Sequence, residues 1–416
     1  MAHPLYTLVL LLLMPWALLH LLWRSRRQPE YLRHWGERFG RFPPRPDGPL
    51  IWIHAVSVGE TRAAQPLVAA LRERHPGHRV LFTHMTPTGR QTSTDLYGDA
   101  VTRVYLPYDT PWAVRRFLTH YRPAIGLIME TELWPNLIAA CRQCRLPLLL
   151  VNARLSQRSA TRYAKVPRLT RRALADLAAI AAQGEDDAAR LRELGARKVE
   201  VLGNVKFDVS PPPAQLELGR RFRARIGNRK VLLCASTREG EEALILDAWQ
   251  RMGDPAVLLA IVPRHPQRFA EVAALVAARG LPMQRRADDA AVAADTQVWL
   301  GDSMGEMFAY YAAADAAFIG GSLLDYGSQN LIEPCAVGVP VLIGPSTYNF
   351  ADAARAAQAQ HAAVAIASAE ELLDEALALL NDPRRRAAKS KSAAEFAARH
   401  RGATARTLSL LERHLG

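Results

Sequence analysis

The sequence predicts two tandem α/β domains, each built on a doubly wound parallel sheet, behind an N-terminal membrane helix. Three observations predict this architecture. From residue 49 onward, apolar runs of strand length alternate with helical segments rich in Ala, Leu and Arg. The alternation breaks at 207–215, which contains three consecutive prolines. Residues 4–23 contain no Asp, Glu, Lys or Arg. A chain of 416 residues is long enough for two or three domains of ordinary size.

The alternation of strands and helices predicts the parallel sheets. Continuous apolar strands separated by helices are typical of a sheet that is covered on both faces. In the first domain the expected strands are 49–56, 78–85, 101–107, 124–130, 146–153, 178–183 and 199–204. In the second domain they are 230–237, 255–264, 296–302, 316–322, 340–345 and 362–368. We expect an anchor at 1–23, a first domain at 24–206, a linker at 207–215, a second domain at 216–385 and a helical tail at 386–416. The two sets of strand ends should border an interdomain cleft.

The N-terminal apolar segment is long enough to cross a bilayer. Twenty helical residues reach about 30 Å, which is the thickness of the hydrocarbon core. A cleaved signal peptide is the alternative, but no basic region precedes the segment and no small-x-small cleavage site follows it. Residues 24–46 contain seven Arg and two Glu, which favours a cytoplasmic position for the bulk of the chain. Because Pro15 interrupts the segment, a monotopic half-inserted hairpin stays open.

The net charge of +13 restricts the partners of the protein. Nucleic acid, an anionic membrane surface and acidic substrates each attract such a chain. The sequence has no RNA-binding signature, so we expect no nucleic-acid partner. The arginines after the anchor account for part of the charge. Cys141 and Cys144 form a C-x-x-C, but no second pair or His cluster completes a zinc site, and no D-x-D follows a strand. We therefore expect packed thiols, a reducing compartment, no cofactor and no essential metal.

Phosphate-binding features follow a strand of the second domain. A glycine turn at 320–322 and a second turn at 327–328 precede a short helix over 330–338. Small residues let the backbone approach a ligand, and the start of a helix offers free N–H groups to a phosphate. Glu333, one turn inside, suits the two ribose hydroxyls, although the helix dipole alone also favours Glu there. Two further loops follow strands of the same sheet and should converge on this point. They contain Pro263, Arg264 and His265, and Met304, Gly305 and Glu306.

The first domain places carboxylates and cations after its strands. Ser57 to Glu60 matches the S-x-x-E capping box, in which Glu60 would accept a hydrogen bond from the N–H of Ser57. The same carboxylate follows a strand and a glycine turn, where open α/β sheets place reactive groups. Glu60 is therefore either a cap or a base, and its position in the first helical turn predicts a lowered pKa. Further candidates after strand ends are Glu130, Glu132, Asn152, Arg154 and Lys206.

These residues resemble those of a known family. The stretches "HAVSVGE", "ETELWPN", "GNVKFD", "PRH", "GEM" and "GGS…SQNLIEP", in this order behind an anchor, are similar to bacterial 3-deoxy-D-manno-octulosonic acid (Kdo) transferases across essentially the whole chain. The resemblance implies a GT-B fold and inverting, metal-independent transfer of Kdo from CMP-Kdo. The implied acceptor is the lipid A precursor at the cytoplasmic face of the inner membrane.

The resemblance also implies roles for individual residues. Glu60 would be the general base on the acceptor hydroxyl, and Glu130 and Lys206 would stabilise the transition state. The implied CMP-binding residues are Pro263, Arg264, Met304, Gly305, Glu306, Asn330, Leu331, Ile332 and Glu333. The family pattern has a glycine where this chain has Ser328, and a serine is tolerated there if its φ is negative.

Two other functions fit parts of the pattern. A GT-B glycosyltransferase with a uridine-nucleotide donor and another lipid-linked acceptor would share the architecture but not "HAVSVGE" and "ETELWPN". A membrane-tethered nucleotide-binding protein without catalysis would leave Glu60 as a cap only. Competition between CMP and UDP for binding distinguishes a Kdo transferase from the uridine-donor enzyme. The activity of a Glu60 variant distinguishes it from a protein without catalysis.

Overall fold

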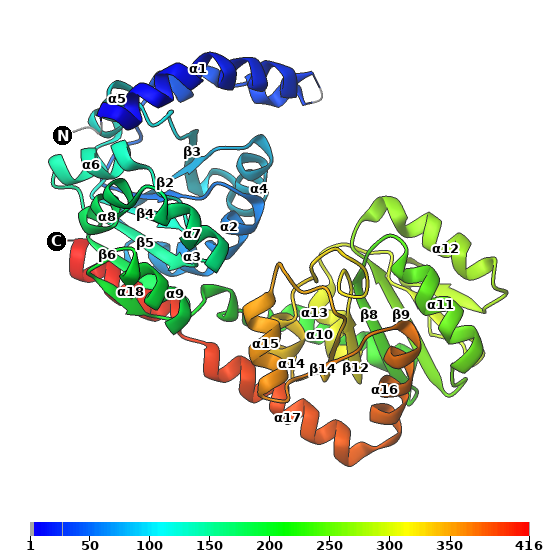
Figure 1. The fold of residues 1–416 in the computed structure, drawn as a ribbon. Helices are drawn as coiled ribbons and strands as arrows, with labels where there is room; N and C mark the ends of the chain where they lie inside the picture. The colour runs from blue at the N-terminus through cyan, green and yellow to red at the C-terminus, as the bar shows by residue number, and fades with distance from the viewer. Residues whose placement is uncertain (1–3, 27, 416) are drawn as a thin grey trace. The chain divides into compact units, whose positions relative to one another are not determined.

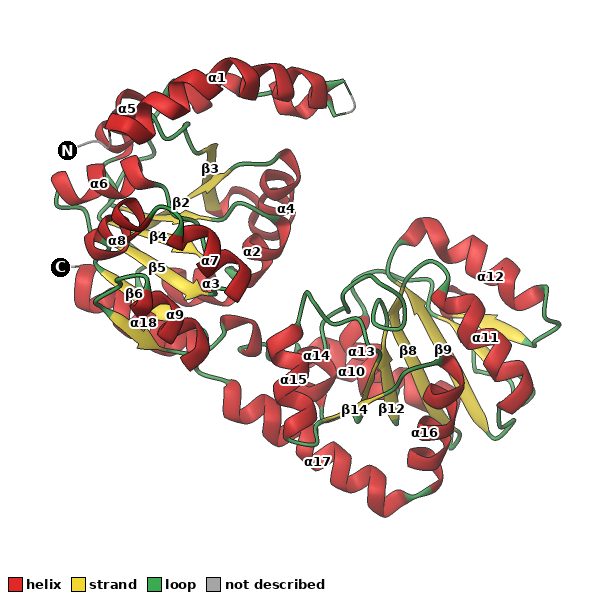
Figure 2. Cartoon of the chain, viewed as in Figure 1, coloured by secondary structure: helices red, strands yellow, loops and turns green. Residues whose placement is uncertain are grey.

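The computed structural model describes residues 4–26 and 28–415, which form two compact units (Figure 1). One unit is built from the chain up to Asp208 together with the segment from Arg401 onward, and the other runs from Val209 to His400. Each unit contains one seven-stranded parallel sheet with helices on both faces (Figure 2). The predicted pair of doubly wound sheets is confirmed.

The first sheet has the strand order β3-β2-β1-β4-β5-β6-β7. Its strands are β1 (Leu50–His54), β2 (Arg79–His84), β3 (Val101–Tyr105), β4 (Ile125–Met129), β5 (Leu148–Ala153), β6 (Ala179–Ala182) and β7 (Val199–Val201). All seven coincide with expected strands. The order reverses between β1 and β4, which pair in register from Ile51 opposite Ile125. Loops that follow two strands at such a reversal diverge to opposite faces, which leaves room for a ligand at the carboxyl ends.

Helices bury both faces of the first sheet. They are α2 (Val58–Ala63), α3 (Gln65–Arg74), α4 (Pro87–Tyr97), α5 (Pro111–Tyr121), α6 (Pro135–Gln143), α7 (Gln157–Ala164), α8 (Pro167–Asp176), α9 (Glu185–Glu193) and α18 (Ala403–Leu415). Trp52 and Phe117 are fully buried in the core on one face, and Ile53 and Phe82 in the core on the other. Full burial of such side chains contributes about 1.5–3 kcal/mol each.

The second sheet has the order β10-β11-β9-β8-β12-β13-β14, and it reverses between β8 and β12. Its strands are β8 (Lys230–Thr237), β9 (Val257–Pro263), β10 (Met283–Arg285), β11 (Val298–Leu300), β12 (Ala316–Ile319), β13 (Val341–Ile343) and β14 (Ala363–Ala365). Its helices are α10 (Pro213–Ile226), α11 (Glu241–Met252), α12 (Phe269–Ala277), α13 (Met307–Ala313), α14 (Ile332–Val337), α15 (Ala351–Ala359), α16 (Ala369–Asn381) and α17 (Pro383–His400). Strand β10 was not expected, because its three residues at the sheet edge form no apolar run.

The C-terminal segment divides between the two units. Helix α17 packs on α14 and α16 of the second unit, whereas α18 packs on α3 of the first. Leu408 and Leu411 of α18 are buried in the first core, and Arg406 Nε donates to the carbonyl of Leu202 at 2.9 Å. The expected tail over 386–416 is therefore two differently placed helices. Helix α10 begins at Pro213, inside the expected linker, because proline is favoured in the first helical turn.

Helix α1 (Pro4–Ser25) continues through Pro15 and has a mean hydropathy of 2.1. Within the described residues it is the one helix long and apolar enough to cross a membrane. The expected apolar helix is confirmed, and its relation to a membrane is taken up below.

Candidate active site

Glu60 forms a capping arrangement at the start of α2. Ser57 Oγ accepts a hydrogen bond from the N–H of Glu60 at 3.2 Å and donates to Glu60 Oε1 at 3.2 Å. Glu60 Oε2 accepts a hydrogen bond from the N–H of Val56 at 2.6 Å. The expected partner was the N–H of Ser57, so the carboxylate reaches one residue further back than predicted. The cap exists, and it orients the carboxylate after β1.

The environment of Glu60 overturns the expected direction of its pKa. The residue is only 9% exposed, and burial raises the pKa of its carboxyl to about 7. The Val56 N–H opposes this rise, whereas the charges of Glu130 and Glu132 add to it. A lowered pKa was expected from the helix dipole, but α2 has only six residues and desolvation outweighs that effect. Burial also raises the pKa of Glu132. The structure thus brings the three candidate carboxylates together.

A second capping box shows what is specific to Glu60. In α16, the N–H of Ala367 donates to Glu371 Oε2 at 2.7 Å, and Ser368 Oγ accepts from the N–H of Glu371 at 3.2 Å. This geometry matches that of Glu60 almost atom for atom, yet Glu371 is exposed. The cap alone therefore carries no functional information. What distinguishes Glu60 is its burial beside two other carboxylates.

Lys206 and Glu130 form an ion pair, with 3.0 Å between Nζ and Oε1. Glu130 directly follows β4, and Lys206 lies in a short 3-10 helix (Val205–Phe207) after β7. Glu130 has φ +59°, a left-handed conformation that costs a non-glycine residue about 1–2 kcal/mol. Such strain is concentrated at functional sites in proteins. The two residues expected to stabilise a transition state are thus in contact.

Three amide side chains hold the Lys206 segment in place. Asn152 Oδ1 accepts from the N–H of Val205 at 3.1 Å, and Asn204 Oδ1 accepts from the N–H of Lys206 at 2.9 Å. Gln183 joins them, because its Nε2 donates to the carbonyl of Asn152 and its Oε1 accepts from Asn204 Nδ2, both at 3.0 Å. Gln183 and Asn204 were not among the predicted site residues. Gln183 directly follows β6 and Asn204 lies in the loop after β7, and these positions after strand ends were the signal that could have identified them.

Buried histidines support the loop that carries Glu60. His84 Nδ1 lies 3.0 Å from the carbonyl oxygen of Ala55, and His54 Nδ1 lies 2.9 Å from Thr83 Oγ1. Burial lowers the pKa of His54 to about 4 and that of His84 to about 3. Both imidazoles are therefore neutral at physiological pH, and they position the loop instead of titrating.

In the second unit, the loops after β9 and β12, two of the three that were expected to converge, meet each other and the end of β8. The N–H of Arg264 donates to the carbonyl of Thr237 at 3.0 Å, and its Nε donates to Gln329 Oε1 at 3.2 Å. Asn330 Oδ1 accepts from the N–H of Ile332 at 2.9 Å, and its Nδ2 donates to Glu333 Oε1 at 3.1 Å. Arg264, Asn330 and Glu333 thus share one edge of the sheet.

The other expected nucleotide-binding residues differ in what they offer. The side chains of Leu331 and Ile332 are fully buried, so they offer a ligand only their backbone. Pro263 is the buried last residue of β9, whereas Met304 is 55% exposed. Gly305 has φ +78° and open space around it. Glu306 Oε1 accepts from Arg286 Nη2 at 3.1 Å, and its Oε2 accepts from Ser303 Oγ at 2.5 Å, so its carboxylate fixes its own loop.

Glu241, at the start of α11, was missed and organises the glycine turn after β12. Its carboxylate is fully buried and accepts hydrogen bonds from the N–H groups of Gly321 at 2.6 Å and Leu323 at 2.9 Å. A Cβ on Gly320 would lie 2.4 Å from the carbonyl oxygen of Ser236. Packing of β12 against β8 therefore explains Gly320 without any ligand. Its position directly after the β8 loop was the sequence feature that could have identified Glu241.

Ser328 contradicts the expected backbone conformation. Its φ is +69°, although a negative φ was the condition for tolerating serine there. The residue is buried, and its N–H donates to the carbonyl of Gly321 at 2.6 Å, which fixes the loop in this form. Formation of this turn outweighs the local strain.

We expect Ser328→Gly to stabilise the protein by about 0.5 kcal/mol. Relief of the left-handed strain contributes about 1–2 kcal/mol, and the greater chain entropy of glycine offsets about 0.5–1 kcal/mol of this gain. Loss of the hydrogen bond from Ser328 Oγ to the carbonyl of Gln329 reduces it further. Urea unfolding of the full chain in detergent measures the difference. Ser210→Gly, at an exposed position without positive φ, is the control and should not stabilise. Destabilisation by Ser328→Gly would contradict this explanation.

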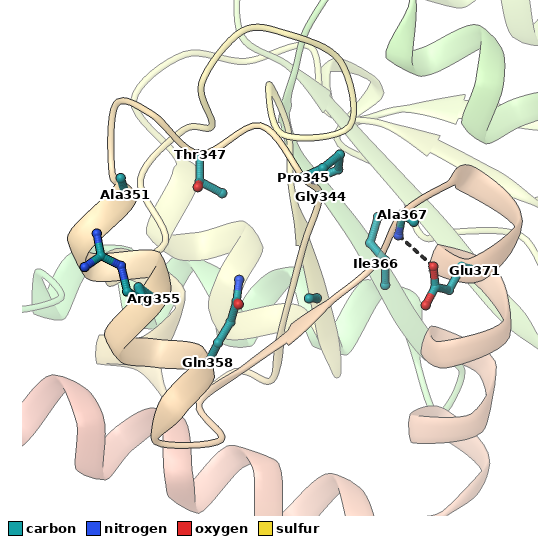
Figure 3. A pocket seen from close by; sticks show the side chains of 10 residues that line it. Gly344, Pro345, Thr347, Ala351, Arg355, Gln358, Ile366, Ala367 and Glu371 are labelled. Carbon is teal, nitrogen blue, oxygen red and sulfur yellow. Dashed lines mark hydrogen bonds between the residues drawn. The ribbon is translucent and has the colours of Figure 1, made fainter.

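A pocket of about 510 Å³ lies after β13 and β14, between α15 and α16 (Figure 3). Gly344, Thr347, Arg355 and Gln358 are among the residues that line it. None of the expected nucleotide-binding residues does. The pocket occupies the β13–β14 end of the sheet, apart from the loops after β8, β9 and β12.

Comparison with known proteins decides the family. The family described as 3-deoxy-D-manno-octulosonic-acid transferase (kdotransferase) matches residues 33–209. A 3-deoxy-D-manno-octulosonic acid transferase of Bordetella pertussis is 47% identical over 434 aligned residues, which cover 100% of both chains. The chain belongs to the 3-deoxy-D-manno-octulosonic acid (Kdo) transferase family. It is therefore a glycosyltransferase, and the two alternative functions are set aside.

Further comparisons agree with this assignment. A Kdo transferase of Haemophilus influenzae is 36% identical over 99% of this chain and 98% of its own length. The crystal structure of UDP-GlcNAc 2-epimerase from Neisseria meningitidis has a TM-score of 0.59 and 14% identity, and it covers 88% of this chain and 99% of that chain. At that identity the likeness concerns the fold alone. It supports the predicted GT-B fold, and the resemblance seen in the sequence motifs is confirmed.

Proposed function

We propose that this Kdo transferase moves Kdo from CMP-Kdo to the lipid A precursor, with inversion and without a metal. The first unit would bind the acceptor and the second the nucleotide sugar. The observation that carries the proposal is the buried Glu60 carboxylate, which has a pKa of about 7 and lies beside Glu130 and Glu132. The family membership supplies the transferred sugar.

Glu60 is the proposed general base. The acceptor hydroxyl loses its proton as it attacks the anomeric carbon of Kdo, and CMP leaves from the opposite face. A base works best when its pKa is close to the working pH, and proton removal of this kind contributes about 10²–10⁴-fold to rate. A pKa of about 7 meets that condition. The cap through Val56 and Ser57 holds the carboxylate in one orientation before the acceptor binds.

The Lys206–Glu130 pair is proposed to stabilise the charges of the transition state. Departure of CMP develops positive, oxocarbenium-like charge on the sugar, which a carboxylate such as Glu130 favours. Kdo carries its own carboxylate, for which Lys206 is the matching cation. Because the two side chains are 3.0 Å apart, one site can serve both charges. Asn152, Gln183 and Asn204 act as positioning residues for Lys206.

The loops of the second unit are the proposed CMP site. Arg264 supplies a guanidinium for the phosphate, and the backbone N–H groups that begin α14 are further donors. Glu333 would accept hydrogen bonds from the ribose hydroxyls. Met304, Gly305 and Glu306 follow β11, on the same edge of the sheet. The open space around Gly305 leaves room for the nucleotide.

We expect Arg264→Ala to weaken CMP binding by at least 10-fold. A hydrogen bond to a charged group contributes about 1.5–3 kcal/mol, and 1.4 kcal/mol corresponds to a factor of ten. Titration calorimetry of the full chain with CMP and with UDP measures both affinity and donor class. Arg221→Ala, which removes an exposed arginine of α10, is the control and should bind CMP like the wild type. UDP binding more tightly than CMP would contradict the proposed donor.

The membrane part of the proposal rests on α1 and the basic segment behind it. Helix α1 exposes large apolar side chains, among them Leu5, Leu12 and Leu19 at 74, 71 and 66%. The positive segment at 24–46 favours a position on the cytoplasmic face of the inner membrane. An acceptor that carries acyl chains and phosphates would be met at that surface.

A further inference from the structure

We infer that α1 lies in the plane of the membrane interface, held to the first unit through its N-terminal end, and does not span the bilayer. The occupant of its exposed face is one leaflet of a bilayer with anionic headgroups. This inference deepens the membrane association included in the proposed function and rests on it. It concerns the topology of the enzyme, which neither hydropathy nor helix length determines.

The N-terminal end of α1 is hydrogen-bonded to buried groups of the first unit. Tyr6 Oη donates to Asp109 Oδ2 at 3.0 Å, and Thr7 Oγ1 accepts from Asn136 Nδ2 at 3.0 Å. Asp109 and Asn136 are 3 and 2% exposed. Asp109 is itself fixed, because it accepts the N–H groups of Asn136 at 3.0 Å and Leu137 at 2.7 Å, at the start of α6. The first two turns of α1 are thus attached to a rigid part of the domain.

The C-terminal end of α1 packs against the segment that follows it in the chain. The chain turns back into a 3-10 helix (Pro29–Leu32) that packs against α1. Leu21 and Tyr31 are buried there, at 8 and 6% exposure. The guanidinium of Arg24 lies 4.8 Å from the centre of the Tyr31 ring, within the range of a cation–π contact. The helix is therefore bonded to the domain at its N-terminal end, and at its C-terminal end the chain folds back along it.

One side of α1 is less exposed than the rest of the helix. The less exposed side chains, most of them three or four residues apart, are Tyr6, Thr7, Leu10, Met14, Ala17, Leu18, Leu21 and Ser25. This spacing marks one face of a helix. Figure 1 shows α1 beginning near α5 and extending from there along one edge of the first unit. A helix that crossed a bilayer away from its domain would have no such less exposed side.

The bonds of Tyr6 and Thr7 to the domain are incompatible with a spanning helix. A helix of 22 residues is about 33 Å long, and the hydrocarbon core is about 30 Å thick. Spanning would place Tyr6 on the far side of the membrane from Arg24. The bonds of Tyr6 and Thr7 to the domain would then break and leave the buried groups of Asp109 and Asn136 with fewer partners, which is costly.

The exposed aromatic side chains of α1 also suit an interface. Trp16 and His20 stack with ring centres 5.4 Å apart, and His20 and Trp23 at 5.7 Å. Trp is favoured at headgroup depth, and polar rings are costly in the hydrocarbon core. In a spanning helix Trp16 would lie about 10 Å deeper than Trp23. Lying in the plane, the three rings share one depth, and the exposed Arg24 and Arg26 meet anionic headgroups.

Depth measurements at three positions test this inference. Leu5, Leu12 and Leu19 are each separated by seven residues, so they lie on one face. Each would be replaced by a spin-labelled cysteine in the full chain carrying Cys144→Ser, since Cys144 is the exposed one of the four cysteines. Electron paramagnetic resonance with oxygen and a water-soluble nickel complex reports depth in vesicles of phosphatidylethanolamine and phosphatidylglycerol. A label at Leu244→Cys, exposed on α11, is the aqueous control.

We expect the three labels to lie at the same depth in the membrane, with differences no larger than the rise of about one helical turn. A spanning helix would instead place successive labels about 10 Å apart in depth, and that result would overturn the inference. Labels that neither oxygen nor nickel reaches would show that a second copy of the chain covers this face, which also overturns it. Labels that are as accessible to water as the control would show that α1 does not contact the membrane. Kdo transfer by the same variants, assayed with detergent-dispersed acceptor, shows separately whether the proposed reaction fails.

Discussion

Glu60→Gln should reduce the turnover of Kdo transfer by about 10²–10⁴-fold, because the variant cannot remove the proton of the acceptor hydroxyl. The amide oxygen of glutamine still accepts the N–H of Val56, so the cap is retained. The loss should appear in kcat, with little change in CMP binding, because the nucleotide contacts lie in other loops. Steady-state kinetics with CMP-Kdo and lipid A precursor measure it.

Stability separates this catalytic loss from damage to the fold. The folded-state pKa of Glu60, about 7, lies above its ordinary value of 4.5. The native state therefore holds the proton more tightly, and the stability that this contributes is present below pH 4.5 and is lost as the pH rises through 7. Glutamine stays neutral, so at pH 8 Glu60→Gln should be at least as stable as the wild type.

Glu371→Gln is the matched control for the cap. It changes the same kind of carboxylate in the same box geometry, but on an exposed helix start. Its turnover should equal that of the wild type. Equal turnover of the wild type, Glu60→Gln and Glu371→Gln would show that Glu60 has only a structural role. A Glu60→Gln variant that unfolds more easily at pH 8 would contradict the account of its burial.

Lys206→Met should lower turnover by about 10²–10³-fold, because it removes the cation proposed to face the donor carboxylate. Removal of one preorganised donor from an active site typically has an effect of this size. The cost in stability should be small, about 1 kcal/mol, because both partners of the pair are partly exposed, at 25 and 19%. Lys198→Met, which removes an exposed lysine before β7, should be indistinguishable from the wild type.

The pH profile tests the other member of the pair. Wild-type kcat should rise with pH and level off above an apparent pKa of about 7, as Glu60 loses its proton. Glu130 is one of the charges that raise the pKa of Glu60, so Glu130→Gln should shift the rising part of the kcat profile to lower pH. A rise of kcat that stays at the same pH or shifts to higher pH would show that Glu130 does not raise the pKa of Glu60.

The fold was largely predictable because buried parallel strands are continuous apolar runs. Strand β10 was missed because an edge strand such as Met283–Arg285 needs no such run. The composition of the tail predicted helices, but composition does not say which core will bury the apolar face of α18. The turn at Ser328 shows the same limit, because its hydrogen bond to Gly321 forces a φ that local sequence disfavours.

The site was predictable in its residues and not in its energetics. Glu60, Glu130 and Lys206 could be identified as polar residues that follow strand ends, because the topology of a parallel sheet brings such positions together. The pKa of Glu60 depends on burial and on Glu130, which lies 70 residues away in the chain, so the direction predicted from the local helix dipole was wrong. Gln183 and Glu241 were missed because an amide and a first-turn glutamate are also common on protein surfaces.

Mass spectrometry of purified lipid A precursor, incubated with CMP-Kdo and the full chain in detergent, tests the central claim most directly. The wild type and Glu371→Gln should each add the mass of one or more Kdo residues, and Glu60→Gln should add none over the same time. A gain with Glu60→Gln equal to that of the wild type would contradict its role as the base. No gain with the wild type would contradict the proposed transfer itself.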